Sequence, residues 1–456
     1  MGIKGKTILL AAALCCLLSG CVAWSADDSY RLPKPPAEYE NLMDTIAQTK
    51  RELAAQSGAT VEDVSPTAGA NTAAVQLLDM DSDGVQETAV TFLRVVGAQE
   101  PIRICFYRLQ ADDGYRPAGV IMGEGDSIYS VRYADVDGVL DPETGRPWNE
   151  IAVSWQMGSN AYYLGLYAVD DGETTELVAT AYQAYQLVDL DQDGRMELAV
   201  CRVDAEQQLS QLEVYTWSES RACQTEQIAL SAGMTAVTQM AVRRLDELTP
   251  ALCLTGTLGE DQRVIELVTR QNGQLRDLTT DEETGVSREC VEGYREALTG
   301  DVNGDGAVDI ARPRRLPYKD GTADTWVIDW VRYTPEGRAG KLCTTYHNTA
   351  DGWYLILPDD WRNVLEIHRS DAIPGQRGVV FSRRLSPEGE PQPFLSVYKL
   401  TGANRNLRAV ANGRFILAED SSTVYAASFL GTWNCGLSQN DLLDSFRLIA
   451  GSWSGE

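Results

Sequence analysis

Short apolar runs separated by turn residues recur along most of the chain. Runs such as 89–96, 162–169 and 264–268 are rich in β-branched and aromatic residues, which favour β-strands. Turn signals lie between them, among them Asp-Asp-Gly at 170–172 and Asn-Gly at 272–273, and such signals are typical of hairpins. The pattern predicts a mainly β chain in which each structural unit contains several short strands.

An acidic segment of the form DxDxDGxx[DE] repeats between these runs. Clear copies begin at Asp79, Asp189 and Asp301, and a looser copy begins at Asp135 and reaches Glu150 after an insertion. The copies at 79 and 135 are 56 residues apart, those at 135 and 189 are 54 apart, and 112 residues separate 189 from 301. Since the last interval is twice the others, one copy within it is predicted to have decayed.

The decayed copy is expected near residue 245. The segment Leu245-Asp246-Glu247-Leu248 stands there, with a shortened loop and most of the acids lost. About five units of about 55 residues then span residues 61–340. Several strands per unit favour β-propeller-type repeats over a helical solenoid. The predicted fold is therefore mainly β, with propeller-type repeats followed by a small C-terminal α+β domain.

The acidic loops have the composition of calcium sites. Calcium takes six to eight oxygen ligands, and acids at positions 1, 3, 5 and 9 of a tight loop, with glycine at position 6, can supply them. Carboxylates held so close together repel one another unless a cation lies between them. The predicted ligands are Asp79, Asp81, Asp83, Glu87, Asp189, Asp191, Asp193, Glu197, Asp301, Asn303, Asp305 and Asp309, with Asp135, Asp137 and Glu150 in the looser copy.

The residues after each loop decide between families of calcium-binding loops. An EF-hand needs glutamate at position 12 and then a helix, but Val90, Val200 and Arg312 stand there. Dockerin loops come as close pairs and also precede helices, whereas the copy at 301 stands alone and runs into Pro313. The repeats instead resemble the FG-GAP/VCBS class of extracellular β-propeller repeats. That resemblance implies structural calcium on the blades and a role in adhesion or recognition, without a shared enzymatic activity.

The flanks of the repeats have patterns of their own. Residues 22–60 are predicted to form a Pro-bearing tether and then a helix over 38–56, with Leu42, Ile46 and Leu53 on one face. Residues 341–456 are predicted to form the α+β domain, and the strand-Pro-x-x-Trp element at 353–361 is loosely similar to the entry of PsbP-like domains. A capping box at 438–441 predicts a final helix ending at 451.

Two classes of function stay open on these patterns. The first is a recognition or scaffold module for a protein or glycan partner. The second is a cell-wall polysaccharide-processing enzyme or an accessory carbohydrate-binding protein, because six of the ten tryptophans fall between 326 and 453 and could stack on sugar rings. The only histidines are His347 and His368, and no HExxH, GxSxG or GxxxxGK[ST] motif occurs. We therefore expect the chain not to be an enzyme.

The net charge of the chain limits the classes of partner that it is expected to bind. The chain has 66 acidic and 39 basic residues, for a formal net charge of -27. Such a surface repels nucleic acids and anionic lipids. We therefore expect no nucleic-acid partner, and the excess of acid favours bound cations.

The first residues have the pattern of a signal segment that directs a protein out of the cytoplasm. Lys4 and Lys6 precede an apolar run over 7–18 that is too short to span a bilayer. The run ends in Leu18-Ser19-Gly20-Cys21, which resembles the lipobox of bacterial lipoproteins. The resemblance implies that residues 1–21 are the signal segment with its lipobox. It also implies a lipid on Cys21 and anchoring at the extracytoplasmic face of the bacterial cell membrane.

Seven cysteines remain in the rest of the chain, and none forms a CxxC pair. Most lie in apolar strand-like runs and are predicted to be small buried side chains. Whether any of them form a disulfide stays open at this point.

Overall fold

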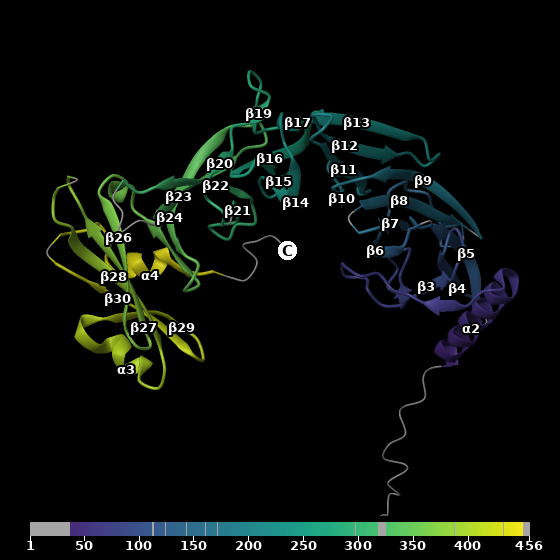
Figure 1. Ribbon diagram of the computed structural model, residues 1–456, viewed down its shortest axis with the longest axis horizontal. Helices are drawn as coiled ribbons and strands as arrows, with labels where there is room; N and C mark the ends of the chain where they lie inside the picture. The colour runs from purple at the N-terminus through teal and green to yellow at the C-terminus, as the bar shows by residue number, and fades with distance from the viewer. Residues whose placement is uncertain are drawn as a thin grey trace, which may run out of the picture.

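The computed structural model describes residues 37–449, apart from 112–113, 124, 143, 160, 171, 297, 318–324, 387 and 432. The chain is mainly β-structure, arranged as antiparallel sheets that follow one another in chain order. The sheets stack face to face and the stack curves into an arch (Figure 1). The predicted signal segment, Cys21 and the start of the tether lie outside the described residues.

The first sheet lies beneath the N-terminal helix. Helix α2 (Ala37–Ser57) confirms the predicted helix, and its Leu42 and Ile46 are buried against Cys105 and Tyr107 of the sheet. The strand order is β1-β3-β4-β5, with β2 also paired to β3. The strands are β1 (Val61–Asp63), β2 (Val75–Leu78), β3 (Thr88–Val95), β4 (Ile102–Leu109) and β5 (Tyr115–Gly123).

The second and third sheets are four-stranded meanders in which each strand pairs with the next. The second sheet contains β6 (Ser127–Ala134), β7 (Glu150–Met157), β8 (Ala161–Asp170) and β9 (Glu173–Ala181). The third contains β10 (Ala184–Val188), β11 (Glu197–Asp204), β12 (Leu209–Trp217) and β13 (Cys223–Ala229). The first strand of each sheet lies on the inner side of the arch and the last on the outer side (Figure 1).

The fourth sheet has the same meander with one added strand, because β20 pairs with the start of β16 on the edge opposite to β15, and β17 pairs with the end of β16. A separate short hairpin, β18–β19, follows β17 and precedes β20. The strands are β14 (Ala236–Arg244), β15 (Pro250–Leu258), β16 (Gln262–Gln271), β17 (Gln274–Asp277), β18 (Thr280–Asp281), β19 (Val286–Ser287) and β20 (Cys290–Glu292).

The fifth sheet has the strand order β21-β22-β23-β24-β25-β31. Its strands are β21 (Thr299–Gly300), β22 (Asp309–Arg315), β23 (Trp326–Tyr333), β24 (Ala339–Asn348), β25 (Trp353–Leu357) and β31 (Phe446–Leu448). The domain boundary predicted at residue 341 falls inside β24 and would divide this sheet. Residues beyond 341 complete the fifth sheet and build a sixth, so they do not form a separate α+β unit.

The last helix is shorter than predicted. Helix α4 (Gln439–Ser445) begins with the expected capping box between Ser438 and Asp441, but it ends before Phe446. Phe446 pairs with Leu355 at the edge of the fifth sheet, and its ring lies 5.6 Å from that of Trp353. Sheet pairing satisfies the backbone groups of 446–448 and buries Phe446 at the same time, so it replaces the last helical turns.

The sixth sheet ends the stack, in the order β26-β27-β28-β30-β29. Helix α3 (Arg405–Val410) covers its outward face, where Ala409 packs on Leu400, Val424 and Ala426. The other elements are η2 (Asp359–Trp361), β26 (Leu365–Ile373), β27 (Gln376–Arg383), β28 (Gln392–Thr401), η3 (Ala411–Gly413), β29 (Phe415–Glu419) and β30 (Thr423–Phe429).

Each neighbouring pair of sheets shares one hydrophobic core. Phe92 of the first sheet and Trp155 of the second belong to one such cluster, and Leu166 of the second and Trp217 of the third belong to the next. Three further clusters join the third sheet to the fourth, the fourth to the fifth and the fifth to the sixth. Central strands are thus buried on both faces, which explains their continuous apolar runs. The stack is stabilised by contacts between neighbours, as in repeat proteins.

Candidate metal centres

Four acidic loops occupy the same place in four sheets. Each connects an edge strand of its sheet to the strand that pairs with it. The loops join β2 to β3, β6 to β7, β10 to β11 and β21 to β22. The decayed copy lies at the corresponding position between β14 and β15. The repeat recognised in the sequence is therefore also a repeat in three dimensions.

The last acid of each loop is fixed by the same hydrogen bond. Its carboxylate accepts from the backbone N–H of the loop's second residue. The four pairs are Met80–Glu87 at 2.8 Å, Val136–Glu150 at 2.9 Å, Leu190–Glu197 at 2.6 Å and Val302–Asp309 at 2.9 Å. Glu150 thus takes the position of Glu87 despite the insertion before it.

The first residue of the three clear loops is also held in a common way. Asp79, Asp189 and Asp301 each accept from the N–H of the glycine at position 6, at 2.8, 3.1 and 2.7 Å. Those glycines have φ values of +93°, +94° and +85°, a left-handed conformation that favours glycine. The turn brings the acids at positions 1, 3 and 5 to one side of the loop.

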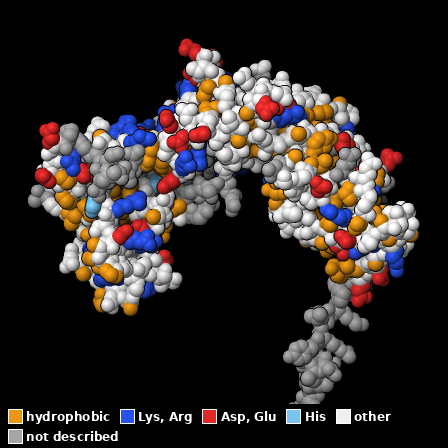
Figure 2. Space-filling model, in the orientation of Figure 1, with side chains coloured by type: hydrophobic (Ala, Val, Ile, Leu, Met, Phe, Trp, Pro, Cys, Tyr) orange, Lys and Arg blue, Asp and Glu red, His pale blue; other side chains and the backbone are white. Residues whose placement is uncertain are grey.

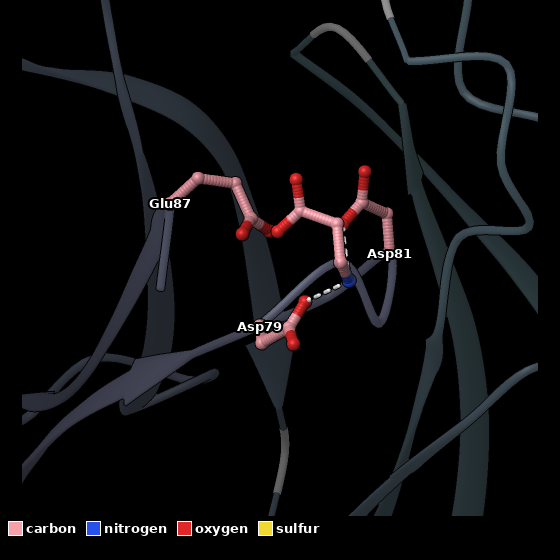
Figure 3. A group of neighbouring side chains, drawn as sticks. Asp79, Asp81 and Glu87 are labelled. Carbon is pink, nitrogen blue, oxygen red and sulfur yellow. Dashed lines mark hydrogen bonds between the residues drawn. The ribbon is translucent and has the colours of Figure 1, made fainter. Parts of the chain in front are cut away.

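The loop at 79–87 brings four carboxylates together (Figure 3). Asp79, Asp81, Asp83 and Glu87 each offer an oxygen within 4.8 Å of the others. Asp81 is only 4% exposed, and its Oδ2 and the Oε2 of Glu87 are buried with no hydrogen-bond partner within the described chain. Burial raises the pKa of Glu87, and the charges of Asp81 and Asp79 raise it further. A hard divalent cation between these oxygens would supply the missing partner.

The loop at 189–197 is similar but has one acid diverted. Asp189, Asp191 and Glu197 offer oxygens within 4.8 Å of one another, and Asp189 Oδ1 is buried without a hydrogen-bond partner in the described chain. Burial raises the pKa of Glu197 to about 7. Asp193 turns away to Arg195, whose Nε lies 3.0 Å from its Oδ2. This loop retains three of its four predicted ligands.

The loop at 135–150 brings Asp135, Asp137 and Glu150 within the same limit. Burial raises the pKa of Glu150 to about 9, and the charge of Asp137 adds to the effect. Asp137 is fully buried and pairs with Arg221 at 2.8 Å, while the same guanidinium pairs with Asp170 at 2.5 Å. The positive charge of Arg221, which belongs to the third sheet, therefore already balances part of the negative charge of this cluster.

The loop at 301–309 differs most from the prediction. Its acids Asp301, Asp305 and Asp309 are not brought within the limit that the other three sets meet. Instead, Arg332 of β23 reaches into the loop. The guanidinium lies 2.8 Å from Asp309 and 3.3 Å from Asn303, and it also pairs with Asp305. The hydrogen bond from Arg332 lowers the pKa of Asp305 to about 2.

The arginines are the part of these sites that sequence reasoning missed. Arg195 directly follows a loop glycine and could have been noticed from its position. Arg221 lies 84 residues from Asp137, and Arg332 lies 23 residues from Asp309. Only the stacking and pairing of strands bring those guanidinium groups to the loops, so no local motif signals them.

A separate cavity of about 700 Å³ lies at the inner edges of the second and third sheets. We call it the tyrosine pocket, after its lining residues Tyr129, Tyr133, Tyr182 and Tyr185. Arg132 and Asn71 add polar groups, and none of the described residues that line it is acidic. Figure 2 shows orange hydrophobic side chains over the part of the arch that contains these sheets, as over the rest of the visible face. In a chain of net charge -27, an acid-free aromatic pocket is distinctive.

Three of the C-terminal tryptophans lie inside the molecule. Trp330, Trp353 and Trp361 are at most 1% exposed and belong to the cores on either side of the fifth sheet. His347 is stacked 5.0 Å from Tyr354, and burial lowers the pKa of its imidazole to about 4. These three tryptophans and His347 are packed inside the molecule, so they are not available to stack on sugar rings.

All seven cysteines from Cys105 to Cys435 are free thiols. Within residues 37–449, leaving aside the gaps given above, no helix has both the length and the apolar composition needed to cross a membrane.

Comparison with known proteins adds little. No protein-family model matches the chain, and no curated protein matches it. Among solved structures, it is similar to one assigned as a 6-phosphogluconolactonase from Bacteroides fragilis, with 12% identity and a TM-score of 0.26. That alignment covers 72% of this chain and 85% of the other. Likeness at this level carries no argument about activity.

Proposed function

We propose that this chain is a calcium-stabilised recognition scaffold, held at the extracytoplasmic face of a bacterial membrane through a lipid on Cys21. The observation that carries the proposal is the cluster at 79–87, where buried carboxylate oxygens of Asp81 and Glu87 lack partners within the described chain. Calcium would replace their mutual repulsion with ligand bonds. It would thereby fix the connection between β2 and β3 of the first sheet.

The architectural part of the proposal is an FG-GAP/VCBS-type propeller repeat in an open arrangement. Its support is the meander sheets, the loops repeated at one position and the inner placement of β6, β10 and β14 (Figure 1). Side-chain contacts link these inner strands at nearly the repeat spacing: Arg132 donates to Gln186 at 2.7 Å, and Gln186 to the carbonyl of Met240 at 2.7 Å. The scaffold function needs no catalytic group, and we propose that the chain is not an enzyme.

The test is the thermal unfolding of the full chain in detergent, in EDTA and in millimolar calcium. At a hundredfold excess over Kd, a ligand specific to the folded state adds about 2.7 kcal/mol per site. We expect calcium to raise Tm, and Asp81→Asn to remove part of the rise. Asp246→Asn is the matched control, because Asp246 begins the decayed loop, accepts from the Leu248 and Thr249 N–H groups and belongs to none of the described metal clusters. Equal Tm values in calcium and EDTA would refute the proposal.

The tyrosine pocket supports a glycan as the partner. Aromatic rings offer flat apolar faces with polar rims, and Arg132 and Asn71 could hydrogen-bond sugar hydroxyls. Calorimetric titration with neutral cello- and chito-oligosaccharides should show binding that Tyr129→Ala weakens at least tenfold. Tyr163→Ala is the control, since Tyr163 is similarly exposed, at 38% against 39%, but does not line the pocket. Equal binding by the two variants would remove the pocket from the proposal.

A further inference from the structure

The four equivalent loops differ in how much positive charge the protein itself supplies. In the described chain no lysine or arginine side chain pairs with the carboxylates of the 79–87 loop; Arg146 reaches only the Ser82 carbonyl, at 3.3 Å. The 189–197 loop has one acid paired with Arg195. The 135–150 loop has its central acid, Asp137, paired with Arg221.

The loop at 301–309 has the most complete internal neutralisation. Arg332 contacts the side chains at positions 3, 5 and 9, namely Asn303, Asp305 and Asp309. The remaining acid, Asp301, accepts from the N–H groups of Gly304, Asp305 and Gly306 at 2.7 to 3.1 Å. The loop therefore has no counterpart of the unpartnered buried oxygens at Asp81, Glu87 and Asp189.

We propose that Arg332 takes the place of calcium in the fifth sheet, so that its loop folds without a metal. The inference rests on the proposed function, because it assigns the ions to the first three sheets and excludes them from the fifth. A guanidinium is planar, always charged and presents several N–H donors, which suits carboxylates arranged around one point. Calcium could enter only by displacing that group from Asp309, which is fully buried.

The sheets of the arch differ in their dependence on calcium. The fourth sheet carries the decayed loop, closed by a hydrogen bond from Leu245 N to Thr249 O at 2.9 Å, and the fifth carries Arg332. Calcium dependence is therefore confined to the arm formed by the first three sheets. Removing calcium loosens that arm and leaves the other arm folded.

The experiment counts bound ions on the full chain by equilibrium dialysis with radioactive calcium. The Asp81→Asn variant should bind one calcium ion fewer than wild type, and the Asp301→Asn variant should bind the same number as wild type. Arg332→Gln should bind one ion more than wild type, and adding Asp301→Asn to it should remove that ion. Arg314→Gln is the matched control: Arg314 lies on the adjacent strand and pairs with Asp329 outside the loop, so the count should stay at the wild-type value.

Two outcomes would overturn the inference in different ways. If the Asp301→Asn variant binds one ion fewer than wild type, the fifth-sheet loop holds calcium. That result refutes the role of Arg332 and leaves the proposed function standing. No calcium bound by wild type refutes both together. Because Arg332→Gln could fail to fold, hydrogen exchange of wild type in EDTA and calcium gives a second measurement. EDTA should speed exchange in β3 and β11 at least tenfold and leave β22 unchanged; faster exchange in β22 would also overturn the inference.

Discussion

Replacing Glu266 with glutamine should make the fourth sheet less sensitive to alkaline pH. Glu266 is fully buried in β16, where its Oε1 accepts from Ser231 N at 2.7 Å. Burial raises the pKa of its carboxyl to about 8, and the charge of Asp277 on the next strand adds to the shift. Unlike the loop acids, Glu266 belongs to none of the candidate metal clusters, so its effect can be measured in saturating calcium.

The sign follows from proton linkage. In the unfolded chain Glu266 titrates near its ordinary value of 4.5, whereas in the folded chain it keeps its proton up to about pH 8. Its contribution to the free energy of unfolding is therefore full below pH 4.5 and is lost as pH rises through 8. The pKa difference of roughly 3.5, at 1.36 kcal/mol for each unit, corresponds to on the order of 5 kcal/mol. Glutamine keeps the acceptor for Ser231 and carries no charge at any pH.

The assay is urea denaturation at pH 5, 7 and 9 in saturating calcium, with hydrogen exchange of β15 and β16 as a local readout. The difference in free energy of unfolding between Glu266→Gln and wild type should grow in favour of the variant from pH 5 to pH 9, by a few kcal/mol. Glu292→Gln on β20 of the same sheet is the control, because Glu292 is exposed. A difference that does not change with pH would refute the assignment of a proton to buried Glu266.

Three further results are expected. Trp361→Ala should lower the free energy of unfolding by about 3–5 kcal/mol, measured in urea, because Trp361 is 1% exposed and donates to the Cys435 carbonyl at 2.8 Å; a loss under 1 kcal/mol would contradict that packing. Leu42→Ala should speed hydrogen exchange in α2 and leave β28 unaffected, since neighbouring sheets alone share cores; equal effects on both would contradict this. A thiol reagent should modify exposed Cys223 and Cys290 in the native protein and leave Cys253 unmodified until urea is added, because burial raises the pKa of Cys253 to about 12.

Much of the β-structure could be predicted because its causes are local. The apolar run over 89–96 becomes β3, and the stripe through Leu42 and Ile46 becomes the buried face of α2. The prediction was wrong where pairing over a long distance decided the outcome. Phe446 has a helical neighbourhood in the sequence, yet it pairs with Leu355, which lies far earlier in the chain. The boundary placed at 341 failed for the same reason, because the loss of the acidic motif does not mark the end of a sheet.

The candidate site shows the same division. The spacing of the loop acids and the glycine at position 6 were sufficient to identify the convergence of Asp79, Asp81 and Glu87. The spacing predicted an equal cage at 301–309, because it cannot show that Arg332 from another strand enters that loop. Charge balance in these loops depends on residues brought in by tertiary structure, and this part could not be obtained from the repeat alone.

Helices α2 and α3 also determine where the stack stops. A column of sheets that share cores has an apolar face at each end, and such a face can accept another sheet as readily as the internal faces do. Leu42 and Ile46 of α2 cover the face of the first sheet, and Ala409 of α3 covers that of the sixth. Without these two helices, molecules could join end to end into fibres, because the first sheet of one copy could pack on the last sheet of another. The two helices therefore limit growth to the sheets that one chain supplies.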